Sequence, residues 1–184
     1  MERFARLATV LVFATFAVVA IALAGTTTGV ADSHRTHFKT FLTGYQETPS
    51  TLNTTGQGTF AMDIVNNDTQ INFTLTYMDL TGNPLFAHIH FGARATSGGV
   101  SAFLCGGSTK PACPASTSGT VTGTIVAVDV IGPMGQGINA GDFASLVRAI
   151  RSGVTYANVH SPKFPSGEIR GQIDGRLGVA KQDD

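Results

Sequence analysis

The chain has 184 residues, of which 13% are charged, and its 12 basic and 12 acidic side chains give a formal net charge of zero. Lys and Arg are not clustered anywhere, so we expect no nucleic acid or other phosphate-rich partner. The length suits one globular domain with accessory ends, and 22 Gly without any Trp favour many short strands over a helical bundle.

Residues 1–24 have the pattern of an export signal. Arg3 and Arg6 precede an uncharged apolar run, and Ala22 and Ala24 form an A-x-A-like site, which predicts a cleaved signal peptide. The alternative is an uncleaved N-terminal anchor, because the run would span about 27 Å as a helix, close to the ~30 Å hydrocarbon core. In either case we expect the remaining chain to be secreted, periplasmic or at the cell surface, with membrane contact only through this segment.

Composition divides the rest of the chain. Residues 25–36 are small and polar and predict a linker, residues 37–176 carry the pattern of a β domain, and residues 177–184 predict a polar tail. Apolar side chains alternate along residues 60–64 and 71–77, with turn-forming residues between them. This pattern predicts a β-hairpin.

Further strands are predicted at residues 84–91 and 119–130 and as a closing pair at residues 154–160 and 168–175. Residues 139–153 instead place apolar side chains at helical spacing, with capping residues before them and a glycine after them. We therefore expect an all-β fold, an antiparallel β-sandwich or Greek-key barrel with one short helix in a late crossover.

Cys105 and Cys113 are the only cysteines, and they bracket a short loop that contains Gly and Pro. The spacing favours a disulfide, which suits an extracytoplasmic protein. The alternative is a pair of metal thiolates, but the chain has no further cysteine to complete a structural zinc site.

Two histidines in the predicted strand 84–91 are candidate metal ligands. His88 and His90 are separated by one residue, so their side chains project from the same face. His160 ends a later predicted strand, and a simple hairpin would set Glu168 nearly opposite it, with Cβ atoms about 5 Å apart. Three imidazoles, with Glu168 as a fourth ligand or as an acceptor that orients an imidazole, suit copper or zinc.

Other polar residues are expected to support this site. Tyr156 and Asn158 share the face of His160, and Arg170 shares the face of Glu168, so Glu168 and Arg170 are expected to form an ion pair or a cross-strand hydrogen-bonding group. The alternative for the histidines is structural, with hydrogen bonds to turns or packing beside aromatic rings. Which strands are neighbours does not follow from the pattern.

Three segments, in order, resemble the CHRD family, the module named after chordin and also found singly in microbial exported proteins. They are "FLTGYQETPS", "AHIHFGA" and "YANVHSPKFPSGEIRGQI", and the resemblance covers about residues 37–175. It implies an all-β extracellular domain and little about activity. The growth-factor binding of chordin is not implied, because the chain lacks chordin's cysteine-rich modules.

The "HIH" and "VH" sequences are also similar to the copper-ligand pattern of copper/zinc superoxide dismutase, another antiparallel barrel. No histidine lies between His90 and His160, so the bridging imidazole and the zinc-loop histidines of that enzyme are missing. This similarity implies at most a mononuclear copper site.

No nucleophile elbow and no phosphate-binding glycine loop is present, and we assign no catalytic residues. We expect an exported, non-enzymatic binding or structural module with an unidentified extracellular or cell-surface partner, holding copper or zinc through the three histidines. Two alternatives stay open: a copper-dependent redox enzyme or copper carrier, and an adhesion or matrix protein without metal.

Overall fold

The computed structural model describes residues 35–107 and 109–174. The predicted export signal, nearly all of the predicted linker and the predicted polar tail therefore lie outside the described residues. Within the described ranges, no helix has both the length and the apolar character needed to cross a membrane.

The described residues form eight strands, one α-helix and three short 3-10 helices. The strands are β1 (His37–Thr43), β2 (Gln57–Val65), β3 (Gln70–Met78), β4 (Phe86–Phe91), β5 (Gly99–Cys105), β6 (Gly119–Ile125), β7 (Thr155–His160) and β8 (Ile169–Ile173). The helices are η1 (Gly44–Gln46), η2 (Ala127–Asp129), η3 (Met134–Gln136) and α1 (Phe143–Arg151).

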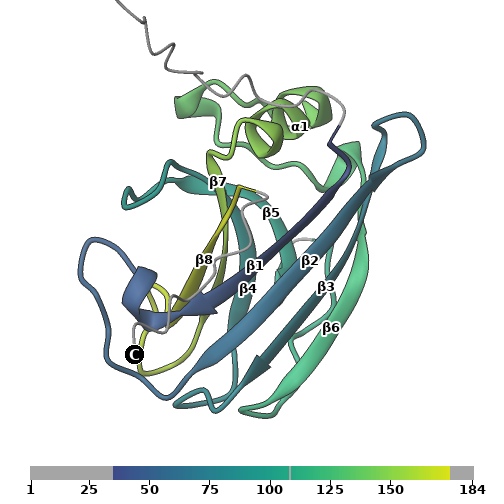
Figure 1. The fold of residues 1–184 in the computed structure, drawn as a ribbon. Helices are drawn as coiled ribbons and strands as arrows, with labels where there is room; N and C mark the ends of the chain where they lie inside the picture. Colours follow the sequence, from purple (N-terminus) through teal and green to yellow (C-terminus); the bar gives the residue numbers. More distant parts are fainter. Residues whose placement is uncertain (1–34, 108, 175–184) are drawn as a thin grey trace, which may run out of the picture. The chain divides into compact units, whose positions relative to one another are not determined.

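All eight strands belong to one antiparallel sheet in the order β5-β4-β7-β8-β1-β2-β3-β6. Figure 1 shows this sheet curling into a nearly closed barrel with β5 and β6 as its two edges. The all-β, antiparallel prediction is confirmed. Of the two predicted architectures, the barrel describes the fold, because one curled sheet replaces the two packed sheets of a sandwich.

The barrel interior is filled by alternate residues of the strands. In the predicted hairpin, now β2 and β3, Phe60 pairs with Leu75 and Met62 pairs with Phe73, and all four side chains are buried. Ile89 of β4 lies in the same hydrophobic core with no exposed surface. The period-two pattern thus directs the apolar residues inward.

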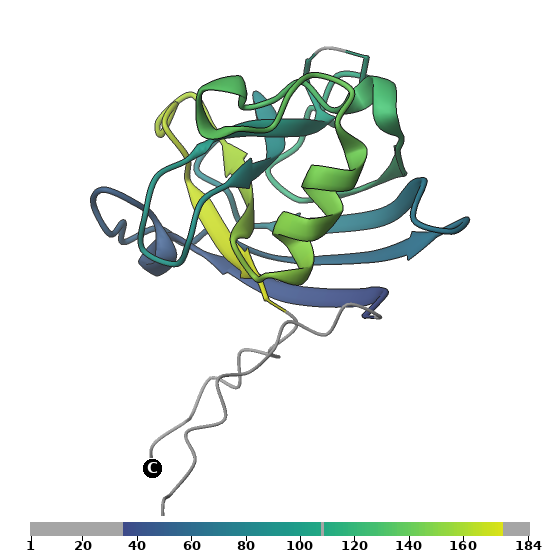
Figure 2. The same cartoon turned by 90° about the horizontal axis from the view of Figure 1, so that it is seen from above.

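Helix α1 lies in the connection between β6 and β7, as predicted for a late crossover, and covers one end of the barrel (Figure 2). The side chain of Asp142 accepts a hydrogen bond from the backbone N–H of Ser145 at 3.0 Å and so caps the helix start. Leu146 and Ile150, one turn apart, are fully buried and dock the helix on the core.

One strand was missed and one predicted strand is too long. β5 was not predicted, because the sequence "GVSAFLC" does not alternate and its pairing with β4 contains register shifts. The predicted strand at residues 119–130 ends early, at Ile125. It stops there because the Asp129 carboxylate accepts a hydrogen bond from the backbone N–H of Val126 at 3.0 Å, which folds residues 127–129 into η2.

Cys105 and Cys113 form the predicted disulfide, with their Cα atoms 4.9 Å apart. It fixes the loop that follows the edge strand β5. In this loop, Lys110 donates a hydrogen bond from Nζ to the carbonyl oxygen of Thr124 on the other edge strand, β6, at 2.6 Å. The loop therefore bridges the two edges of the sheet.

Candidate metal centre

The centre lies on the face of β4 and β7 that points away from the core. Along β4, Ala87 and Ile89 belong to the hydrophobic core, so His88 and His90 emerge on the opposite face. β4 pairs with β7, in a register that sets Phe86 opposite His160. This pairing supplies the strand adjacency that the sequence pattern left open.

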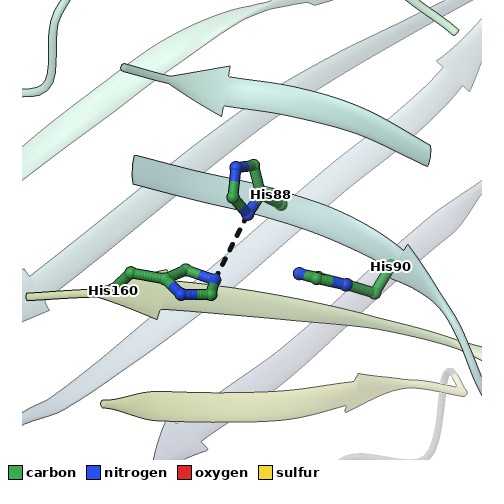
Figure 3. Close-up of side chains that lie close together, drawn as sticks. All are labelled: His88, His90 and His160. Atoms are coloured by element: carbon green, nitrogen blue, oxygen red, sulfur yellow. Dashed lines mark hydrogen bonds between the residues drawn. The ribbon is translucent and has the colours of Figure 1, made fainter. Parts of the chain in front are cut away.

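The three predicted histidines come together. Each of His88, His90 and His160 has one ring nitrogen that could bind a metal, and these nitrogens all lie within 4.8 Å of one another. Nδ1 of His88 is 3.2 Å from Nε2 of His160, and the His90 ring lies beside them (Figure 3). The three side chains are only 6–8% exposed.

Backbone carbonyls fix the orientation of two of the rings. Nδ1 of His90 donates to the carbonyl oxygen of Gly98 at 3.0 Å, and Nδ1 of His160 donates to that of Pro165, also at 3.0 Å. Because a carbonyl oxygen can only accept, both Nδ1 atoms carry the proton and both Nε2 atoms carry a lone pair. An imidazole held in this way is the usual arrangement of a metal-binding histidine.

Two further observations fit a metal ion. The Nε2 atom of His90 is buried without a hydrogen-bond partner, although buried polar atoms normally have one. His88 turns Nδ1 toward His160, so its own unpartnered Nε2 lies on the other side of its ring and is not the ligand atom. Two nitrogens bound to one tetrahedral ion at 2.0–2.1 Å would be about 3.3 Å apart, close to the 3.2 Å between His88 and His160. The residues present therefore fit copper or zinc.

Burial keeps the three imidazoles neutral. It lowers the pKa of His88 to about 3, with additional repulsion from His160 and His90. It lowers the pKa of His90 to about 4 against the opposing effect of the Gly98 hydrogen bond, and it also lowers the pKa of His160. The metal-free site thus presents neutral nitrogen bases at neutral pH.

Aromatic rings enclose the histidines. The His88 ring meets Phe103 edge-on, with centroids 4.3 Å apart, and the His90 ring stacks on Tyr156 at 4.7 Å with an interplanar angle of 3°. The sequence also allowed a structural role, in which the histidines bond to turns and pack beside aromatic rings. Both kinds of contact are present. Those contacts still leave Nε2 of His90, on the side of its ring opposite Gly98, unpartnered.

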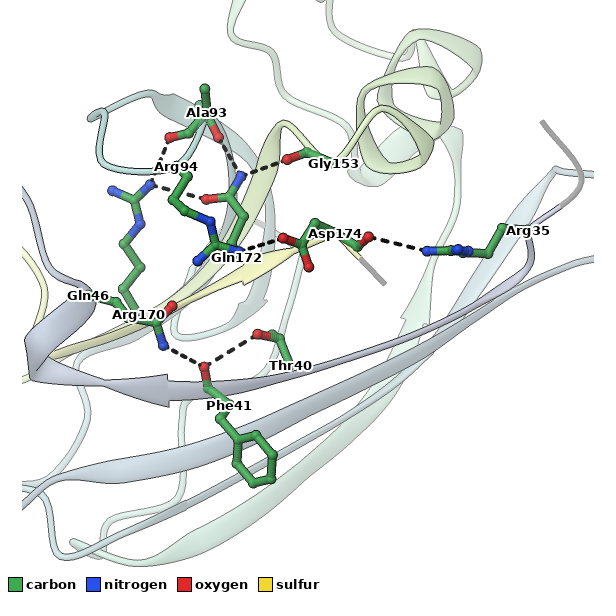
Figure 4. A network of polar contacts seen from close by, with 11 residues as sticks. Arg35, Thr40, Phe41, Gln46, Ala93, Arg94, Gly153, Arg170, Gln172 and Asp174 are labelled. Atoms are coloured by element: carbon green, nitrogen blue, oxygen red, sulfur yellow. Dashed lines mark hydrogen bonds and ion pairs between the residues drawn. The ribbon is translucent and has the colours of Figure 1, made fainter. Parts of the chain in front are cut away.

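Arg170 lies in the next layer, where the guanidinium carbon is 3.5 Å from the centroid of Tyr156. The guanidinium donates to the hydroxyl of Thr48 at 2.6 Å and to the carbonyl oxygens of Thr96 and Ala93 at 2.7 and 3.1 Å. Figure 4 shows the contacts with Ala93 and with Gln172. Arg170 therefore ties β8 to the loop after η1 and to the β4–β5 loop, whose Gly98 carbonyl holds His90.

Glu47 is a buried carboxyl group that the sequence analysis missed. Its Oε1 accepts a hydrogen bond from Nδ2 of Asn158 at 2.6 Å. Burial raises the pKa of Glu47 to about 7, against the opposing effects of Asn158 and Arg170. The family-like segment "GYQETPS" contains this residue, but nothing in the local pattern shows that it folds back onto β7.

Glu168 does not join the three histidines, which corrects the predicted ligand set. The β7–β8 hairpin forms as expected, but Oε1 of Glu168 accepts from the hydroxyl of Thr54 at 2.7 Å and from the N–H of Thr81 at 2.8 Å. Oε2 accepts from the Thr81 hydroxyl at 3.0 Å. The carboxylate therefore fastens two loops to the start of β8. The expected pairing with Arg170 is replaced by these contacts.

Fold and site together define a curled antiparallel β domain with one disulfide and a buried three-histidine centre on its outer face. The family model described as the CHRD domain matches residues 38–173, and the chain belongs to the CHRD family. This membership supports a binding or structural module, and the disulfide fits an oxidising compartment. No curated protein and no solved structure matches the chain.

Proposed function

We propose that this chain is an exported CHRD-domain module that acts outside the cytoplasm and holds one copper or zinc ion through His88, His90 and His160. The family match and the apolar N-terminal segment support the extracytoplasmic setting. The proposal gives the domain a specific ligand and assigns it no chemical reaction.

The observation that carries the proposal is the convergence of the three ring nitrogens in a buried site. Purely structural histidines would be expected to use their buried nitrogens in hydrogen bonds. Here Nε2 of His90 has no such partner, while loop carbonyls hold the rings of His90 and His160 from their other side. This combination suits a ligand set prepared for an ion.

The test is metal analysis of the untagged protein after incubation with copper or zinc and removal of excess ion. We expect one ion per chain, and we expect His90→Ala and His160→Ala to abolish stoichiometric binding. His37→Ala is the matched control. His37 is exposed and contacts the Asp63 carboxylate, and its strand, β1, is separated from β4 by β7 and β8. It should bind like the unaltered chain.

Failure to bind either ion stoichiometrically would contradict the proposal and leave an adhesion or matrix module without metal. Binding that survives both histidine substitutions would also contradict it. Turnover of a redox substrate by the copper-loaded protein would instead identify the copper enzyme considered from the sequence.

A further inference from the structure

We infer that the three-histidine centre selects monovalent copper, Cu(I), over divalent zinc. This inference rests on the proposed function, because it concerns which ion the same three side chains hold. It follows from the ligands that surround the ion and from the nearest buried charge.

The set of ligands has no anionic member. Among the residues that the structure describes, the group of His, Cys, Asp and Glu side chains able to hold one ion consists of His88, His90 and His160. The carboxylate predicted as a ligand, Glu168, is held by Thr54 and Thr81. Three neutral imidazoles leave the charge of the ion uncompensated. The free-energy cost of burying that charge is larger for a divalent ion than for a monovalent one.

The number of ligands also favours Cu(I). Zinc in proteins is almost always four-coordinate, so three histidines would need a water or another group to complete the set. Cu(I) has a filled d shell and is stable with three ligands. The ring centroids of Phe103 and His88 are 4.3 Å apart, and those of Tyr156 and His90 are 4.7 Å apart. The three histidines are at most 8% exposed. This enclosure favours the ion that needs no added water.

The buried guanidinium of Arg170 favours the ion of lower charge. Arg170 lies 3.5 Å from the Tyr156 centroid, and Tyr156 lies 4.7 Å from the His90 centroid, so the guanidinium carbon is at most about 8 Å from the imidazole centroid. Tyr156 comes from the strand between those of His90 and Arg170, and its ring is the spacer between ligand and cation. At an effective dielectric constant of about 20, a positive charge about 10 Å from the ion weakens the binding affinity by roughly tenfold for each unit of charge on the ion.

Glu47 provides the opposing charge. It interacts electrostatically with Arg170 and accepts a hydrogen bond from Asn158, which pairs with His88 across β4 and β7. Removing Arg170 or Glu47 should therefore shift the preference between the two ions in opposite directions. A purely structural role for either residue would lower both affinities together.

The experiment measures both affinities on the untagged protein at pH 8, where Glu47 is ionised. Cu(I) is supplied as its acetonitrile complex under nitrogen and competes with a colorimetric Cu(I) chelator. Zinc is supplied as zinc chloride with a colorimetric zinc chelator. We expect Cu(I) to bind at least tenfold more tightly than zinc. Equal or tighter zinc binding would overturn the selection and leave the proposed function standing, whereas binding of neither ion would overturn the proposed function itself.

Two variants test the role of charge. Glu47→Gln keeps the acceptor for Asn158 and removes the negative charge, so the ratio of Cu(I) to zinc affinity should rise at least threefold. Arg170→Gln should lower that ratio at least threefold. Shifts in the same direction, or an unchanged ratio in both variants, would refute the charge argument. If Arg170→Gln does not fold, the sign for Glu47→Gln alone decides the charge argument.

Discussion

Acid should destabilise the metal-free protein through its buried histidines. The pKa values of His88 and His90 fall from an ordinary 6.5 to about 3 and about 4 on folding. Between pH 7 and pH 5 both side chains gain a proton in the unfolded chain and stay neutral in the folded protein. The linkage relation then predicts a loss of about 2 kcal/mol of unfolding free energy for each histidine.

Glu47 opposes this loss. Its pKa rises from an ordinary 4.5 to about 7 on folding, so its stabilising contribution is present at low pH and is lost as the pH rises toward 7. Between pH 7 and pH 5 it therefore adds about 2 kcal/mol to the folded state. The expected net loss for these three groups is about 2 kcal/mol, and His160, whose pKa is also lowered, acts in the same direction as the other histidines.

Urea unfolding with chelator present, followed by circular dichroism at pH 7 and pH 5, measures the difference. Glu47→Gln removes the compensating group, so its loss should grow to about 4 kcal/mol, whereas His88→Gln removes one titrating histidine, so its loss should shrink by about 2 kcal/mol. His37→Ala should match the unaltered chain. Equal stability at the two pH values in Glu47→Gln would show that burial does not hold these imidazoles neutral.

Three further predictions concern stability. Ile89→Ala should cost about 2–5 kcal/mol in urea unfolding, because Ile89 is fully buried in the core; a loss below 1 kcal/mol would contradict the inward assignment of this face. Replacing Cys105 and Cys113 together by Ala should cost about 2.5 kcal/mol through the released loop, with native circular dichroism retained at low temperature; collapse of the fold would disprove a local role. Asp142→Ala should cost about 1 kcal/mol through the lost helix cap, and unchanged unfolding would show that the cap is dispensable.

Strand periodicity predicted much of this fold and part of the site. The alternation around Ile89 was enough to set His88 and His90 on one face, and the polar alternation of β7 placed His160 with Tyr156 and Asn158. These predictions succeed because the pleat is a local property of the chain.

The parts that the sequence left open or predicted wrongly depend on contacts distant in sequence. The approach of His160 to His88 needs the pairing of β4 with β7, which are 72 residues apart at these positions. Glu168 was expected beside His160 from the hairpin register, but its partners Thr54 and Thr81 come from two other loops. The carbonyls of Gly98 and Pro165 leave no signal in the sequence, because every residue has a carbonyl group.

The disulfide loop that links β5 to β6 also affects how the molecule meets other chains. Each edge strand of an open sheet offers unpaired backbone groups to which a foreign strand can add. Lys110 of this loop donates a hydrogen bond to the carbonyl oxygen of Thr124 on β6. The loop therefore occupies part of the β6 edge. Because the disulfide fixes this loop, the cross-link also helps to keep this part of the edge occupied.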